Sequence, residues 1–153
     1  MTIEIVGKPL SALDQAIILA TRLHAGQKDK GGAPYILHPL RLMSRCTSDV
    51  HRIVAVLHDI LEDGKAAGIT IKGIENQFGA TIADAVDALS RRAEEGETYS
   101  QFIERCATNP IAREVKLIDL DDNMDLTRLG REPTSEDERR LKKYARARAK
   151  LMQ

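Results

Sequence analysis

The chain has 153 residues, of which 42% are hydrophobic and 30% are charged. This composition is typical of one globular domain and excludes a disordered or fibrous chain. The 23 Lys and Arg residues balance 23 Asp and Glu residues, so no overall charge favours binding to nucleic acid or to an anionic membrane.

The cysteines and the N-terminus indicate the compartment. Cys46 and Cys106 are the only cysteines and form no CxxC pair, as is typical of proteins in a reducing environment. The first residues lack an apolar signal core, and no apolar run approaches the roughly 18 residues of a membrane span. We therefore expect a cytoplasmic protein without a membrane segment, and the sequence leaves its oligomeric state open.

Helical patterns dominate the first half of the chain. Aromatic residues make up only 3%, so the core should consist of aliphatic side chains packed between helices. A helix is predicted over 11–24, a glycine-rich loop follows at 26–33, and a second helix opens at His38. Asp49 is expected to cap a third helix, which continues through Leu61 and is buried on nearly every side.

Further helices are predicted in the second half. In chain order they span 70–78, 81–93, 99–107, 111–126 and 135–151. The only strand candidate is Ile3 to Val6. The predicted fold class is all-α. We expect one compact helical bundle over residues 1–153, with a motif-bearing core at about 13–129 and a C-terminal helix at about 135–151.

A polar pair interrupts the most apolar predicted helix. His58 and Asp59 lie among aliphatic residues, where polar groups are costly unless they are hydrogen-bonded or coordinated. Glu62 and Asp63 follow one turn later, at a neighbouring point on the helix. This cluster suggests a metal site, although His58 and Asp59 could instead bond to neighbouring helices.

The segment from residue 116 to 125 is rich in acidic residues. Its alternating acids resemble the start of a calcium loop, but Met124 stands where such a loop needs glycine. As a helix, the segment places Asp119 and Asn123 on one face, whereas Asp121 and Asp122 are expected to be solvated.

One histidine outside this helix completes a candidate donor set. His38 follows the glycine-rich loop, and a single loop histidine can equally be structural. Together with His58, Asp59 and Asp119 it forms a mixed nitrogen and oxygen set that suits manganese, iron or another first-row divalent ion. Such an ion activates water and polarises a phosphoryl group, and Glu62 and Asp63 would orient or deprotonate the water.

Several motifs occur in a characteristic order. They are His24-Ala25-Gly26-Gln27, Pro34-Tyr35-Ile36-Leu37-His38-Pro39, Leu57-His58-Asp59-Ile60-Leu61-Glu62-Asp63, Phe78-Gly79 and Lys116-Leu117-Ile118-Asp119 with Asn123-Met124. This order resembles the HD hydrolase domain of the RelA/SpoT type and its small stand-alone relatives, which remove pyrophosphate from the 3′ position of (p)ppGpp.

The resemblance implies a role for each motif residue. It implies that manganese is held by His38, His58, Asp59 and Asp119, and that Glu62 and Asp63 activate the water. It further implies that Lys30, Tyr35 and Asn123 border the nucleotide. The activity it implies is that of a metal-dependent phosphohydrolase acting on a phosphorylated nucleotide.

Two positions depart from the family pattern. Asp29 stands where the family carries an arginine against the guanine, and Leu120 stands where it carries a second arginine. We therefore expect weak use of (p)ppGpp, or a preference for another phosphorylated nucleotide. Asp29 and the acidic pair at 121–122 also motivate an alternative, a nucleotide-binding or regulatory HD module with little turnover.

The C-terminal helix is strongly basic. Residues 139–150 include seven basic residues and no acid. These bases could contact nucleic acid, but the zero net charge and the lack of interleaved aromatic residues argue against that function. A solvated face on a helix that packs through Leu141, Tyr144 and Leu151 is the preferred interpretation.

Overall fold

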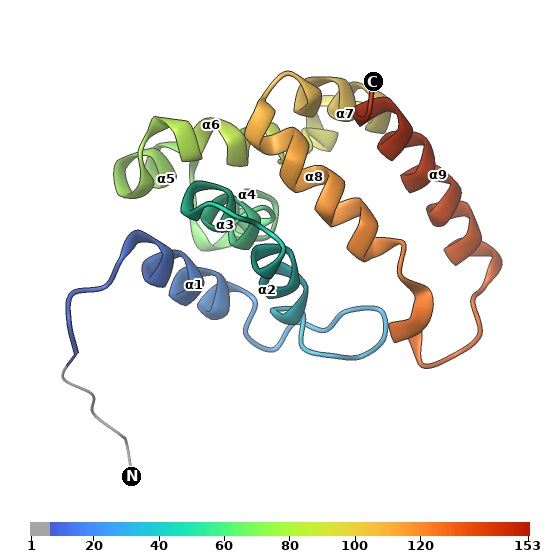
Figure 1. Ribbon diagram of the computed structural model, residues 1–153, viewed down its shortest axis with the longest axis horizontal. Coiled ribbons are helices and arrows are strands. Elements are labelled where there is room, and N and C mark those ends of the chain that lie inside the picture. The colour runs from blue at the N-terminus through green and yellow to red at the C-terminus, as the bar shows by residue number, and fades with distance from the viewer. Residues whose placement is uncertain (1–6) are drawn as a thin grey trace, which may run out of the picture.

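The computed structural model describes residues 7–153, which form helices joined by loops of different lengths (Figure 1). The helices are α1 (Ala12–Leu23), α2 (Leu37–Ser44), α3 (Asp49–Val56), α4 (Ile60–Asp63), α5 (Ile71–Phe78), α6 (Ala80–Ala88), α7 (Tyr99–Ala107), α8 (Pro110–Asn123) and α9 (Ser135–Leu151). Short 3-10 turns lie at η1 (Lys65–Ala67), η2 (Ala93–Glu95) and η3 (Leu126–Leu129). Within 7–153 the only bridge between extended segments joins Lys28 and Pro34, which confirms the all-α class. The strand candidate Ile3 to Val6 lies outside the described residues.

Helix starts follow their capping residues. Ser11, Thr98 and Thr134 each form a reciprocal capping box with the third residue of the helix they precede. The predicted bounds of α5 and α7 agree closely with the structure, whereas α6 ends five residues before the predicted residue 93. The guanidinium of Arg105 donates to the carbonyls of Asp87 (3.0 Å) and Ser90 (2.7 Å), so these groups are satisfied without a further helical turn.

The predicted third helix is divided. Its N-cap is Ser48 rather than Asp49, because the Ser48 hydroxyl accepts the N–H of His51. α3 ends at Val56 and α4 begins at Ile60, so His58 and Asp59 lie in a tight turn and not within a continuous helix. This turn interrupts the helix at the two residues that the sequence had marked for chemistry.

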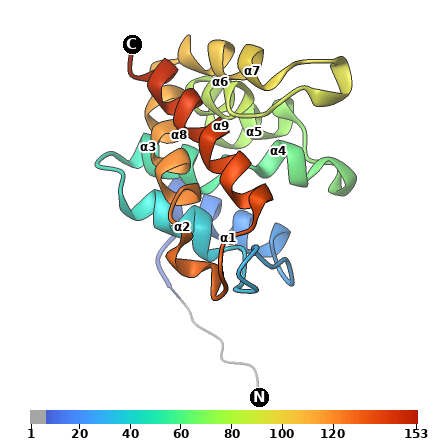
Figure 2. The same cartoon turned by 90° about the vertical axis from the view of Figure 1, so that its right-hand side faces the viewer.

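α3 lies near the centre of the molecule. It packs against α1, α2, α6 and α8, and residues 53–57 are all buried. A second, smaller core joins α7, α8 and α9 through Phe102, Ile103, Leu120, Ala147 and Leu151. α9 lies along α7 and α8 (Figure 2), so the predicted packing of the C-terminal helix on the domain is confirmed. No helix within 7–153 is long and apolar enough to span a bilayer.

Candidate active site

Residues from three parts of the fold meet in a buried group that can hold a metal ion. His38 of α2, His58 of the turn between α3 and α4, and Asp119 of α8 each offer one ligand atom, and these atoms lie within 4.8 Å of one another. Nε2 of His38 lies 3.0 Å from Oδ1 of Asp119, and Nε2 of His58 lies 3.7 Å from the same oxygen. All three side chains are buried.

Hydrogen bonds on the far side of each ring aim the two imidazoles. Nδ1 of His58 lies 2.8 Å from the carbonyl oxygen of Ala55. This carbonyl can face the ring because α3 ends at the next residue, Val56. Nδ1 of His38 lies 2.7 Å from Oδ2 of Asp122. Each ring therefore uses Nδ1 for support and turns Nε2 towards Asp119, an arrangement typical of histidine ligands.

The fourth predicted ligand lies at the edge of this group. Oδ2 of Asp59 is 2.9 Å from Nε2 of His58 and accepts the hydroxyl of Tyr35, but Asp59 is not one of the three mutually close residues. Burial would raise the pKa of Asp59, but the charge of His58 lowers it to about 2. Asp59 is therefore held as a carboxylate beside the group.

The electrostatics of the group suit a divalent cation. Burial alone would lower the pKa of His58, but the charge and hydrogen bond of Asp59 raise it to about 9. The pKa of His38 is also raised. Burial alone would lower it, but the hydrogen bonds to Asp119 and Asp122 outweigh that effect. The same carboxylate field that stabilises protonated imidazoles would stabilise a metal ion between them, and imidazole and carboxylate ligands match first-row divalent metals.

Asp119 is fixed by its own helix. Lys116, one turn before it, donates to Oδ2 at 2.7 Å, and the side-chain amide of Asn123, one turn after it, donates to Oδ1 at 2.8 Å. Burial would raise the pKa of Asp119, but Lys116 and the two histidines hold it well below its ordinary value. The predicted pairing of Asp119 and Asn123 on one helix face is confirmed.

The two predicted water-activating residues lie at the end of α4. Glu62 accepts the backbone N–H of Arg91, and Asp63 lies 3.7 Å from Nδ1 of His24. The pKa of Glu62 is raised, chiefly because its carboxyl is partly withdrawn from solvent. Neither residue belongs to the group of three buried ligands.

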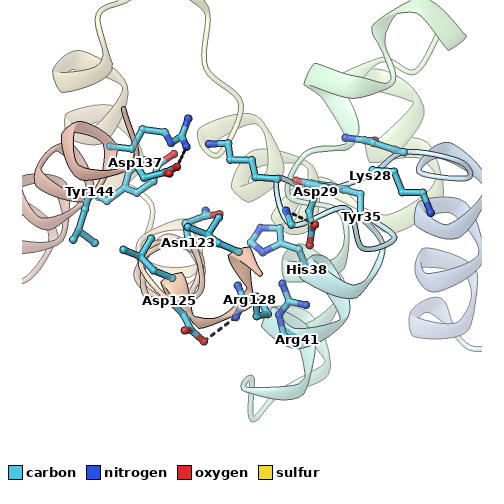
Figure 3. A pocket seen from close by; sticks show the side chains of 17 residues that line it. Lys28, Asp29, Tyr35, His38, Arg41, Asn123, Asp125, Arg128, Asp137 and Tyr144 are labelled. Carbon is cyan, nitrogen blue, oxygen red and sulfur yellow. Dashed lines mark hydrogen bonds and ion pairs between the residues drawn. The ribbon is translucent and has the colours of Figure 1, made fainter. Parts of the chain in front are cut away.

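A pocket of about 250 Å³ opens beside His38. It lies between the loop that carries Asp29 and the helix α9, which contributes Asp137 and Tyr144 (Figure 3). The three predicted substrate-binding residues Lys30, Tyr35 and Asn123 all line it. Among residues 7–153 Lys30 forms no ion pair, and Asp137 in the same lining is paired with Arg131 and Arg140.

Asp29 is engaged by its own loop. Its Oδ1 accepts the N–H groups of Gly31 and Ala33, each at 2.9 Å. Gly31 is packed so closely that a Cβ atom would lie 2.3 Å from the carbonyl oxygen of Arg128, and therefore only glycine fits there. Asp29 thus shapes this loop of the pocket as well as placing a negative charge in it.

Asp122 was predicted to be a solvated acid, and that prediction is wrong. Its side chain is fully buried, and besides His38 it binds Arg41, Arg45 and Arg128. The neighbouring Asp121 pairs with Arg148 at 2.7 Å. Neither carboxylate is left to repel a phosphate, so the acidic pair no longer supports a module with little turnover. Helical spacing places Asp122 one turn from Asp119, but spacing alone does not show that its carboxylate is buried.

Sequence comparison identifies the family of this chain. A sequence model described as an HD domain matches residues 16–113, more than half of the chain. The chain belongs to the HD-domain family. The matched region of this HD domain includes His38, His58, Asp59, Glu62 and Asp63 and ends shortly before Asp119.

Several curated relatives align with the HD domain. This chain is 32% identical to a probable GTP pyrophosphokinase of Mycobacterium leprae (strain TN) over 126 residues, which are 75% of this chain and 16% of that protein. Guanosine-3′,5′-bis(diphosphate) 3′-pyrophosphohydrolases of Aquifex aeolicus and Vibrio cholerae are 32% and 33% identical over 122 and 86 residues, or 73% and 54% of this chain. The alignments cover 17% and 12% of those two proteins. The chain thus spans less than a fifth of the length of these relatives.

One solved structure has the same fold. It is described as a metazoan ortholog of SpoT that hydrolyses ppGpp, and it superposes with a TM-score of 0.74 over 97% of this chain and 89% of that chain. The sequence identity is 20%, so this likeness concerns the fold alone. The predicted resemblance to HD domains of the RelA/SpoT type is confirmed at the level of family and fold.

Proposed function

We propose that this HD domain is a metal-dependent phosphohydrolase of a phosphorylated nucleotide, with guanosine-3′,5′-bis(diphosphate) as its first candidate substrate. The observation that carries the proposal is the buried group of His38, His58 and Asp119 at the edge of a pocket lined by Lys30 and Asn123. The names of the Aquifex and Vibrio relatives support the choice of a 3′-pyrophosphate ester. We also propose that the family core and α9 act as one unit, because α9 supplies one wall of the pocket.

His38, His58, Asp59 and Asp119 are the proposed ligands, and manganese is the proposed ion. Their neutral imidazole and carboxylate donors suit that metal. When bound, such an ion polarises the phosphoryl oxygen and lowers the pKa of a nearby water. Tyr35 supports the site by donating a hydrogen bond to Asp59, which helps to fix this carboxylate.

The remaining residues have roles in binding and proton transfer. Lys30 is proposed to pair with a phosphate of the substrate, because its ammonium lines the pocket without a carboxylate partner among the described residues. Glu62 or Asp63 is proposed to accept a proton from the attacking water, whose oxygen bonds to the phosphorus next to the 3′ oxygen. The bond between that phosphorus and the 3′ oxygen breaks, pyrophosphate leaves, and the 3′ oxygen takes up a proton to become a hydroxyl. Asn123 lines the pocket and donates a hydrogen bond to Asp119. It therefore connects the proposed nucleotide pocket with the proposed metal ligand.

The direct test measures pyrophosphate release. With manganese, the protein is expected to convert guanosine-3′,5′-bis(diphosphate) into GDP and pyrophosphate, and chelation should abolish the reaction. Asp119→Ala should lose bound metal and activity together, because it removes a buried charged ligand. Asp121→Ala is the matched control, since Asp121 is an exposed neighbour on the same helix. Hydrolysis at an unchanged rate after complete removal of metal would refute the proposal.

Substitutions at Asp29 should separate its charge from its hydrogen bonds. Asp29→Asn keeps an acceptor for Gly31 and Ala33 but removes the negative charge, so we expect KM for the nucleotide to fall about two- to fivefold with little change in kcat. Asp29→Ala removes the acceptor as well, and KM should rise because the loop loosens. Steady-state kinetics of both variants measure these changes in KM. An unchanged KM in Asp29→Asn would show that the negative charge of Asp29 does not affect nucleotide binding.

A further inference from the structure

A second pocket, of about 410 Å³, lies between α7 and α9. Its floor is formed by Tyr99 and Ile103 of α7 and Ala147 of α9. We call it the basic groove, because all the charged residues that line it are basic: Arg139, Lys142, Lys143, Arg146 and Lys150. No carboxylate belongs to its lining.

The groove uses a different face of α9 from the active-site pocket. Its basic residues recur at spacings of three and four, which places them on one side of the helix. The active-site pocket is lined by Asp137, Arg140, Leu141 and Tyr144, which follow the same spacing on another side. α9 is therefore a wall shared by two separate hollows, and Figure 2 shows it facing the viewer.

The positive charge of the groove is largely uncompensated. Lys150 pairs with Glu104, but Arg139, Lys142 and Arg146 are exposed and form no ion pair with another residue of 7–153. Lys143 lies 4.6 Å from the centroid of the Tyr99 ring and likewise lacks a carboxylate partner in this range. Like charges four residues apart destabilise a helix, so the arrangement works against the stability of α9. A bound anion would remove that repulsion.

Two features favour a compact anion over a nucleic-acid strand. The basic side chains surround one hollow of ligand size rather than following an extended path. Tyr99 is the only aromatic residue in the lining, and Lys143 already covers its ring, so successive bases would find no stacking surface. We propose that the basic groove is a second anion-binding site, which takes a polyphosphate chain that is either free or attached to a nucleoside.

The experiment follows backbone amide signals of ¹⁵N-labelled protein in Mg²⁺-containing buffer at 150 mM salt. Inorganic tripolyphosphate should cause saturable shifts at Ser100, Ile103 and Ala147, independently of any shifts at Tyr35 and Asn123 in the other pocket. ATP is titrated in a parallel series. Tighter binding of ATP with shifts at Tyr99 would identify a nucleotide as the source of the phosphates, whereas equal affinity would identify the phosphate chain itself.

A matched pair of triple variants tests the location. Arg139→Gln/Lys142→Gln/Arg146→Gln should weaken tripolyphosphate binding in the groove at least tenfold. Lys8→Gln/Arg22→Gln/Lys72→Gln removes the same charge at exposed sites outside both pockets and should change affinity less than twofold. Thermal unfolding checks that both variants remain folded. The proposal fails if shifts are confined to the active-site pocket, if both variants weaken binding equally, or if a single-stranded oligonucleotide binds the groove tenfold more tightly than tripolyphosphate.

Discussion

Replacing Glu62 with glutamine and Asp63 with asparagine is expected to lower kcat at least about a hundredfold, the usual scale for loss of a positioned acid or base. Metal content and fold should be unchanged, because neither side chain belongs to the buried group of His38, His58 and Asp119. Turnover of guanosine-3′,5′-bis(diphosphate) and elemental analysis of the same preparations measure the two effects separately.

The single variants should show which carboxylate carries the proton. The carboxyl of Glu62 is partly withdrawn from solvent, which raises its pKa towards the range useful to a base at neutral pH, so Glu62→Gln is expected to have the larger effect. Glu95→Gln removes an exposed carboxylate in the nearby η2 turn and should leave kcat unchanged. A double variant as active as the wild type would place proton transfer elsewhere.

The fold was predictable wherever a local signal decided it. Ser11 and Thr98 form the caps at which α1 and α7 begin, and the sequence placed those helices within a residue or two. The prediction was wrong where a tertiary contact decided the outcome. α6 ends early, and Arg105 binds the carbonyls of Asp87 in its last turn and of Ser90 just beyond it. No pattern near residue 88 reveals this partner, which lies on the next helix.

The candidate site was predictable for a different reason. His58 and Asp59 are polar residues in an otherwise apolar segment, and this mismatch marks them without knowledge of the fold. Asp119 was marked by the helix face that it shares with Asn123. The partner of His38 could not be found in that way, because Asp122 lies 84 residues away among other acids. Helical spacing put Asp122 one turn from Asp119, but only the packing of α2 against α8 shows that it is buried.

Asp122→Ala is expected to destabilise the folded protein strongly. The change leaves Nδ1 of His38 without its partner and removes the carboxylate that compensates Arg41 and Arg128. Breaking a buried charge network in this way typically costs about 3–5 kcal/mol of unfolding free energy. Chemical denaturation measures the loss, and Asp121→Ala should stay within about 0.5 kcal/mol of the wild type because Asp121 is exposed.

Asp122→Asn should separate the positioning of His38 from stability. Asparagine fills the same volume and its oxygen can still accept from Nδ1 of His38, so more of the fold should be retained than in Asp122→Ala. The lost charge weakens the orientation of the ring, and affinity for manganese is expected to fall about 10- to 100-fold, as is usual when the partner of a histidine ligand is changed. Titration of manganese into the folded variant measures this loss directly. Wild-type affinity in Asp122→Asn would show that the negative charge of Asp122 is not needed to position the imidazole of His38.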